Sequence, residues 1–376
     1  MKTFSTGIIG FGMIGKVHAF GYATLPYHID PNINAKFRIT HVATAHDESA
    51  EKAKAVCGAD VATTDFRNIT ENPDIDIVHI CSPNEQHVEQ LISAIRHGKH
   101  IYCDKPLCCT MEEAELVRGE MQRSNYSATN QMTFHLRFFP AVMRMKQLID
   151  ENRLGRILQF RTVFLHSSNV DSNAPFKWKH AKGGGVILDL ASHVLDIVDY
   201  LVGPIDSLVA QTQLAYPQRP VSTPSKANPN PPLRDVVVED AVSMLAKMEN
   251  GAHGVIEASK LSTGTTDDFR IEIHGEKGAV RFRLLDPQTV EFFDATASDK
   301  PLGGTSGWLS IGCNNRYESP HLDFPNAKAI IGWTRAHAAC LVNFLNAVAA
   351  GKPTTPDLMQ GFKIQQYMER AMLKPF

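Results

Sequence analysis

Two short apolar runs that each stop at a proline constrain the fold of this chain most. The first covers residues 77–82 and ends at Pro83, and the second covers residues 99–103 and ends before Pro106. Proline cannot donate a hydrogen bond to a sheet and disfavours helix in the residue before it, so both runs are predicted to be strands that end there. Because ligands of open α/β sheets bind beyond the carboxyl ends of the strands, Lys105 in the second loop is expected at a ligand site.

The start of the chain carries a glycine-rich loop between a strand-like stretch and a helical run. In the pattern G-x-G-x-x-G the first glycine permits a tight turn, the second admits a pyrophosphate, and the third packs the helix against the strand. The helix N-terminus then faces the phosphates with its N–H groups. An ordinary glycine turn before a buried helix is the alternative. The residues predicted to bind a dinucleotide here are Gly10, Phe11, Gly12, Met13, Ile14 and Gly15.

The residue after the second predicted strand bears on the choice of cofactor. Asp47 follows a strand over about residues 39–45, farther from the glycines than the usual ~20 residues because residues 25–36 look like an insertion. A carboxylate at this position binds the adenosine ribose, and the next basic residue is Lys52, which favours NAD over NADP. The alternative is that Asp47 only caps a helix that begins near Ser49.

The order of predicted elements indicates two domains of the α/β class. Strands and helices alternate up to about residue 131, which is typical of a doubly wound parallel sheet. Later strands are joined by hairpin signals such as Asn250-Gly251, which predict a large, mainly antiparallel open sheet. The predicted domains are residues 1–131, which bind NAD(P), and residues 132–376, which bind substrate and mediate oligomer contacts. The proline-rich residues 216–232 are predicted to be a loop, either a rim of the active site or a surface excursion.

The composition argues against several classes of protein. A net charge of -2 with no basic block makes nucleic acid and membrane surfaces poor partners. Residues 1–15 lack the features of a signal peptide and no apolar run reaches ~18 residues, so a cytoplasmic protein is expected. Seven cysteines with no C-x-x-C pair argue against a disulfide framework or a zinc module.

A helix predicted to begin near Val186 carries residues that suit alcohol oxidation. It follows three glycines, residues 183–185, which let the backbone pass close to a ligand. Asp189 and His193 are four residues apart, so their side chains are expected to meet on the helix. A histidine base takes the hydroxyl proton, a carboxylate orients it, and Lys105 supplies a positive charge near the alkoxide.

Two alternatives for this helix remain open. The Asp189 and His193 pair is often a structural hydrogen bond in proteins. A metal site that uses Asp189, His193 and Asp196 is the second alternative, although no other ligand cluster has suitable spacing and no metal is expected.

The chain resembles the Gfo/Idh/MocA family, the glucose-fructose oxidoreductase and inositol dehydrogenase group. The likeness covers nearly the whole chain and includes GFGMIGKVH, GKHIYCDKP and GGGVILDLASHVLDIVDYLVG. It implies a Rossmann domain and an α/β domain whose open sheet often mediates dimers or tetramers. It also implies that Lys105, Asp189 and His193 act together at the substrate. Two residues depart from the family pattern, because Asp104 replaces a glutamate and Lys179 stands where arginine is common.

Further binding residues are expected at the strand ends and in the loop before the glycines. The strand ends add predicted cofactor contacts from Ser82, Pro83, Asn84, His87, Asp104 and Lys105. The loop over residues 166–182 adds candidate substrate contacts, although polar loop residues are commonly just solvated. These candidates are His166, Asn169, Asp171 and Trp178.

Together the residues and the resemblance predict an NAD-dependent oxidoreductase, with NADP as the alternative cofactor. It would move hydride between nicotinamide and a secondary hydroxyl of a sugar, cyclitol or sugar derivative. One alternative is a glycoside hydrolase that retains NAD and works by transient oxidation, and another is a non-catalytic regulatory binder. A homodimer or homotetramer is expected.

Overall fold

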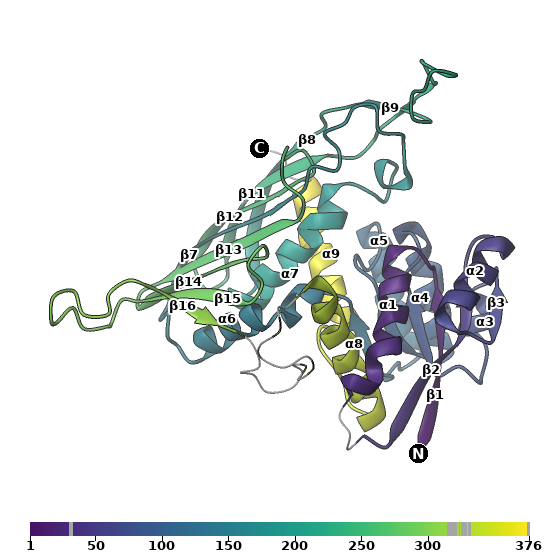
Figure 1. Cartoon of the computed structure of the whole chain (residues 1–376), viewed down its shortest axis with the longest axis horizontal. Coiled ribbons are helices and arrows are strands. Elements are labelled where there is room, and N and C mark those ends of the chain that lie inside the picture. The colour runs from purple at the N-terminus through teal and green to yellow at the C-terminus, as the bar shows by residue number, and fades with distance from the viewer. Residues whose placement is uncertain (30–32, 314–321, 323, 325–328, 330–331, 374–376) are drawn as a thin grey trace. The chain divides into compact units, whose positions relative to one another are not determined.

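The structure, a computed structural model, consists of two compact units (Figure 1). It describes residues 1–29, 33–313, 322, 324, 329 and 332–373. Unit 1 comprises residues 1–138 and 318–365, and unit 2 comprises residues 139–317 and 366–376. The predicted domains, residues 1–131 and 132–376, differ from these units chiefly in residues 318–365. That the two parts act as a cofactor domain and a substrate domain stays a prediction.

Unit 1 contains a six-stranded sheet in which every neighbouring pair is parallel. Its strands are β1 (Lys2–Ile9), β2 (Ala35–Ala43), β3 (Val61–Thr63), β4 (Ile77–Ile80), β5 (His100–Cys103) and β6 (Asn130–Met132). Their order, β3-β2-β1-β4-β5-β6, is that of a dinucleotide-binding doubly wound fold, so the predicted fold class is confirmed. The sequence did not predict β3, because three residues are too few to show an apolar period.

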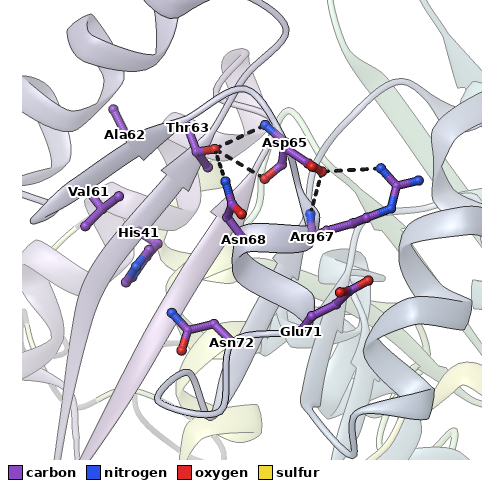
Figure 2. A pocket seen from close by; sticks show the side chains of 9 residues that line it. All are labelled: His41, Val61, Ala62, Thr63, Asp65, Arg67, Asn68, Glu71 and Asn72. Atoms are coloured by element: carbon purple, nitrogen blue, oxygen red, sulfur yellow. Dashed lines mark hydrogen bonds and ion pairs between the residues drawn. The ribbon is translucent and has the colours of Figure 1, made fainter.

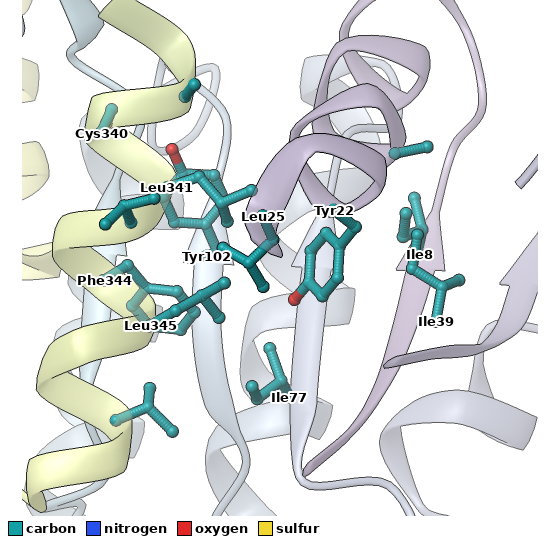
Figure 3. Packing of buried hydrophobic residues seen from close by; sticks show 14 of the residues in the cluster. Ile8, Tyr22, Leu25, Ile39, Ile77, Tyr102, Cys340, Leu341, Phe344 and Leu345 are labelled. Atoms are coloured by element: carbon teal, nitrogen blue, oxygen red, sulfur yellow. The ribbon is translucent and has the colours of Figure 1, made fainter. Parts of the chain in front are cut away.

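The helices of unit 1 enclose a continuous apolar core (Figure 3). They are α1 (Met13–Thr24), α2 (Asp47–Cys57), α3 (Arg67–Thr70), α4 (His87–Arg96), α5 (Met111–Arg123), α8 (Trp333–Ala350), the start of α9 (Leu358–Leu373), and the short 3-10 helices η1 (Leu25–Tyr27), η2 (Asn84–Gln86) and η3 (His135–Phe138). Helices α1 and α8 approach closely, because a Cβ atom on Gly21 would lie 2.6 Å from Leu341. This packing, with Tyr22, Tyr102 and Phe344 in the same core, explains why α8 belongs to unit 1.

Unit 2 contains an eight-stranded, mainly antiparallel sheet, as predicted. Its strands are β7 (Ile157–Leu165), β8 (Ile205–Gln213), β11 (Ala241–Met248), β12 (His253–Ser259), β13 (Asp268–Gly275), β14 (Gly278–Arg283), β15 (Thr289–Asp294) and β16 (Trp308–Gly312). The order is β16-β15-β14-β13-β7-β12-β11-β8, and the pair β7 and β12 is parallel. Buried and exposed residues alternate along β11, so one face of the sheet is covered and the other faces outward. The helices that pack on unit 2 strands include α6 (Pro140–Asp150) and α7 (Ser192–Leu201) (Figure 1).

Two local expectations about the backbone were wrong. Residues 216–232 are not wholly a loop, because β9 (Gln218–Pro220) pairs with β10 (Leu233–Asp235). The helix expected from Val186 begins with a π-helical turn, η5 (Ile187–Ala191). Residues 25–36 include η1 and the first residues of β2, while residues 30–32 lie outside the described residues; that this segment is an insertion stays a prediction. Within the part of the chain that is described, no helix combines the length and apolar character needed to span a bilayer.

Candidate active site

The glycine loop of unit 1 has the geometry that a dinucleotide requires. Gly10 adopts φ +88°, a left-handed conformation that glycine tolerates without strain. A Cβ atom on Gly15 would lie 2.2 Å from the Gly10 carbonyl oxygen, so this position must lack a side chain. A Cβ atom on Gly12 would meet nothing within 4 Å, which leaves space beside the N-terminus of α1. The loop therefore fits a pyrophosphate at Gly12. Of the other predicted loop residues, Phe11 packs against the core and Met13 is exposed.

The end of β2 brings Asp47 to the same edge of the sheet as the glycine loop. The Gly10 N–H donates a hydrogen bond to the Ala43 carbonyl at 2.9 Å, and Asp47 follows four residues later. Helix α2 begins at Asp47 itself, and its N-cap residue is His46. Asp47 is therefore not the capping residue, and it is exposed; its contact with a ligand stays a prediction.

The loop after β4 holds four predicted cofactor residues, namely Ser82, Pro83, Asn84 and His87. His87 is buried, with Nδ1 3.0 Å from the Pro106 carbonyl oxygen and Nε2 3.0 Å from the Ser82 carbonyl oxygen. Burial lowers the pKa of His87. This histidine therefore joins the loops that follow β4 and β5. The Ser82 hydroxyl donates a hydrogen bond to Gln90 Oε1 at 2.7 Å.

Lys105 is half-buried after β5, and its charge acts on His337, which the sequence did not indicate and which contacts two further aromatic residues. His337 stacks on His135 with ring centroids 3.9 Å apart, and Trp333 lies 4.2 Å from His337. The pKa of His337 is well below its usual value because of burial and then of the nearby charges, which include Lys105. Sequence reasoning missed these residues because no local pattern links α8 to the end of β5.

Buried polar side chains of α1 and of the end of β4 form a cluster. His18 Nδ1 is 3.1 Å from Cys81 Sγ and 3.1 Å from His79 Nδ1. His79 Nε2 is 3.0 Å from the Tyr22 hydroxyl. Burial lowers the pKa of His18 to about 4, so this ring is neutral near neutral pH. These contacts join α1 to the end of β4, and the sequence analysis did not identify them.

Two of the three consecutive glycines, Gly184 and Gly185, lie close to other parts of the protein. A Cβ atom on Gly184 would lie 2.1 Å from the Lys179 carbonyl oxygen. Gly185 has φ +95°, and a Cβ atom there would lie 2.5 Å from Glu239 Oε1. The same carboxylate accepts a hydrogen bond from the Ile187 N–H at 2.8 Å, and burial raises the pKa of Glu239. The glycines thus let Glu239 hold the start of η5; approach of a ligand to them stays a prediction.

Asp189 forms an ion pair that the sequence analysis missed. Its Oδ2 atom lies 2.9 Å from Nζ of Lys260, the residue after β12. The segment that carries Asp189 and His193 begins with the π-helical turn η5, and α7 begins at Ser192. That the two side chains meet stays a prediction. No local sequence pattern links Lys260 to this segment. π-helical turns are frequent at functional sites.

His193 lies in the first turn of α7 and is buried. Its ring faces Phe164 of β7 edge-on, with centroids 6.0 Å apart. Unit 2 thus places a buried imidazole and an ion-paired carboxylate on one continuous helical segment. Such a pair can accept a proton and stabilise the charge that results.

The four predicted substrate residues of unit 2 have different surroundings. His166 Nε2 lies 3.0 Å from Asp267 Oδ1. Asn169 is buried and donates a hydrogen bond to Asp240 Oδ1 at 2.6 Å, so its amide supports the fold. Asp171 is exposed, and the Trp178 side chain is 56% exposed. These last two residues are the most accessible of the four.

A further feature does not coincide with the predicted site. A hollow of about 630 Å³ on unit 1 is lined by residues of β2, β3, α3 and their loops, including Thr63, Asp65 and Asn68 (Figure 2). None of the predicted site residues lines it.

The metal alternative gains no support, since the described residues contain no group of three His, Cys, Asp or Glu arranged to hold an ion.

Comparisons with protein families agree with this geometry. Residues 4–127 match the model of an oxidoreductase family with an NAD-binding Rossmann fold. Residues 142–281 match the GFO/IDH/MocA C-terminal domain. The first match contains the glycine loop and Lys105. The second match contains the helical segment that carries Asp189 and His193.

Individual relatives extend the likeness over almost the whole chain. Levoglucosan dehydrogenase of Pseudarthrobacter phenanthrenivorans is 31% identical over 97% of this chain and 94% of its own length. Inositol 2-dehydrogenase of Rhizobium meliloti is 30% identical over 78% of this chain and 80% of its own. A solved structure of levoglucosan dehydrogenase in complex with NADH and levoglucosan superposes with a TM-score of 0.88, at 28% identity, over 99% of this chain and 96% of that one. These relatives are dehydrogenases, and they give no support to the glycoside hydrolase alternative.

Proposed function

Because the chain belongs to the Gfo/Idh/MocA family of NAD-binding oxidoreductases, we propose that it oxidises a secondary hydroxyl of a sugar or cyclitol. The cofactor is NAD. The preferred substrate class follows from relatives that are named for levoglucosan and inositol. We also propose that it works in the cytoplasm as a homodimer or homotetramer, with the outward face of the unit 2 sheet as the contact.

Each of the predicted site residues has a separate role in the proposed reaction. The loop from Gly10 to Gly15 holds the pyrophosphate, and Asp47 holds the adenosine ribose. Bound NAD supplies the acceptor for the hydride that leaves the carbinol carbon. His193 takes the hydroxyl proton, and Asp189 orients the ring and stabilises its charged form. Lys105 offsets the negative charge that develops on the reacting oxygen.

The observation that carries this proposal is that Asp189 and the buried His193 lie on one continuous helical segment of unit 2, formed by η5 and α7. In the proposed mechanism the carboxylate orients the imidazole and stabilises the charge that the ring gains when it takes a proton. The same segment lies within the residues that match the GFO/IDH/MocA C-terminal domain.

The test is turnover with a panel of polyols in the presence of NAD. The panel contains levoglucosan, myo-inositol, scyllo-inositol, glucose and a set of glycosides. We expect NADH to accumulate in proportion to the oxidised product for at least one cyclic polyol. Release of a free sugar from a glycoside without NADH accumulation would instead indicate the hydrolase. No turnover on any member of the panel would favour the regulatory binder.

A further inference from the structure

A lysine that the proposed mechanism does not use is buried beside Asp189. Lys260 directly follows β12, and its side chain is 1% exposed. Its Nζ lies 2.9 Å from Asp189 Oδ2 and donates a hydrogen bond to the Gly185 carbonyl at 3.4 Å. Lysine is almost never fully buried unless it is paired, because removing an ammonium group from water is costly. The ion pair with Asp189 compensates for that cost.

The backbone around Lys260 is held on both sides. Its N–H donates a hydrogen bond to the Asp240 carbonyl at 2.9 Å, and its own carbonyl accepts one from the Asn169 N–H at 3.0 Å. The strand before it pairs with β7 on one side and β11 on the other. Lys260 is therefore attached to a rigid element, and a rigid element can hold a charge in a precise position.

Further charged groups of unit 2 surround this ion pair. Burial lowers the pKa of Lys179, and the charge of Lys260 lowers it further. Burial raises the pKa of Glu239, and Lys260 acts against that rise. Burial lowers the pKa of His180 to about 4, and the charges of Arg219, Lys179 and Lys260 lower it further. Lys260 thus contributes to the electrostatics of several groups around Asp189.

We propose that Lys260 is a positioning residue of the active site, whose ammonium keeps Asp189 in place and ionised so that Asp189 can orient His193. The inference deepens the proposed function and rests on it. The geometry of the ion pair gives the reason for this role. Asp189 lies in the π-helical turn, and Lys260 holds its carboxylate from a different element of unit 2. Lys260 engages Oδ2, and the orienting role falls to Oδ1.

The test compares three variants of the full chain with NAD present. Lys260→Met removes the charge and keeps the length of the side chain, whereas Lys260→Arg keeps the charge. Lys277→Met is the matched control, because Lys277 is an exposed lysine in the turn between β13 and β14. NMR titration of the histidine side chains, with the His193 signal assigned from His193→Gln, reports on the site without a substrate.

We expect Lys260→Met to shift protonation of His193 to higher pH, because loss of a nearby positive charge makes proton binding easier. The acidic limb of the activity profile should move in the same direction. The kcat should fall by about 10-fold to 100-fold, the scale for a group that orients a catalytic residue. NAD affinity should change little. Lys260→Arg should keep the His193 titration and the kcat close to those of the unaltered protein, and Lys277→Met should alter neither.

A folded Lys260→Met protein with an unchanged His193 titration and unchanged kcat would overturn the proposal. If this variant fails to fold, Asp189→Asn is compared with the double variant Asp189→Asn/Lys260→Met, in which both charges are removed. Equal activities support action through Asp189, and a further loss in the double variant contradicts it. A shifted His193 titration in a protein that oxidises no sugar would keep the positioning role and reject the proposed function.

Discussion

The hydroxyl of Thr133 donates a 2.5 Å hydrogen bond to Oδ1 of Asp104. The same oxygen accepts the Lys105 N–H at 2.9 Å, and the Asp104 N–H donates to the Ile80 carbonyl at 2.9 Å. Asp104, which replaces the glutamate common in the family, therefore ties the end of β5 to β4 and to the loop after β6. The shorter side chain still makes contacts that hold the backbone of Lys105.

Lys105→Ala should lower the rate of hydride transfer by roughly 10²-fold or more, since one preorganised charge near the reacting oxygen is lost. NAD affinity should change little, because the pyrophosphate and ribose contacts lie elsewhere. Single-turnover absorbance measures the rate, and calorimetry measures the affinity. Lys52→Ala, which removes an exposed lysine of α2, serves as the control. Transfer as fast as in the unaltered protein would remove Lys105 from the mechanism.

His193→Ala should also slow hydride transfer by about 10² to 10⁴-fold, the usual contribution of a general base. Part of the loss should return at high pH, where the substrate hydroxyl needs less help from a base. His253→Ala provides a control at an exposed histidine of unit 2. A purely structural histidine would give the opposite pattern, namely a lower melting temperature with turnover per folded molecule nearly intact.

Asp47 should make the protein prefer NAD(H) to NADP(H), because its carboxylate repels a 2'-phosphate. Calorimetric titration with both cofactors measures the preference in the unaltered protein. Asp47→Ala should narrow the difference, whereas Glu48→Ala, one residue later in the same exposed turn, should not. Tighter binding of NADP(H) to the unaltered protein would contradict the role given to Asp47 and leave the fold unaffected.

His18 should make the stability of the protein depend on pH. Burial lowers its pKa to about 4 from 6.5, so the unfolded chain binds more protons between these values. Its contribution is complete above pH 6.5 and is lost as the pH falls towards 4. At about 1.4 kcal/mol per pKa unit, this is roughly 3 kcal/mol of unfolding free energy.

Urea unfolding across this pH range tests the linkage. His18→Gln should flatten the dependence of unfolding free energy on pH, although buried His79 will leave part of the slope. His97→Gln, at an exposed histidine at the end of α4, should keep the full slope. An unchanged slope in His18→Gln would show that the pKa of His18 does not differ between the folded and the unfolded state, which would contradict this prediction.

The outward face of the unit 2 sheet should form the subunit contact. Leu245 of β11 lies opposite Val255 of β12, and both side chains are exposed in the single chain. Leu245→Arg should weaken the assembly, because a charge would be buried in an apolar contact. Light scattering measures the mass, and Leu116→Arg on α5 of unit 1 is the control. A monomer at micromolar concentration in the unaltered protein would contradict this assembly.

The sequence by itself determined the elements that depend on neighbouring residues. The glycine loop from Gly10 to Gly15 could be recognised because a tight turn, a close approach and a helix start impose residue types at fixed spacing. Strands β4 and β5 lie within the runs predicted over residues 77–82 and 99–103, because a proline follows each run and limits the strand. Lys105 was identified because a proline marks the end of its strand.

Only the tertiary structure decided the contacts between distant segments. The pairing of Asp189 with Lys260 joins residues 71 positions apart, and no local period reveals it. The same holds for α8, whose apolar face packs against α1 although most of the chain separates them. The π-helical turn at η5 was also hidden, because its period differs too little from that of an α-helix to show within five residues. These arrangements depend on burial and on packing between distant segments of the chain. A local sequence pattern does not specify which distant segments pack together.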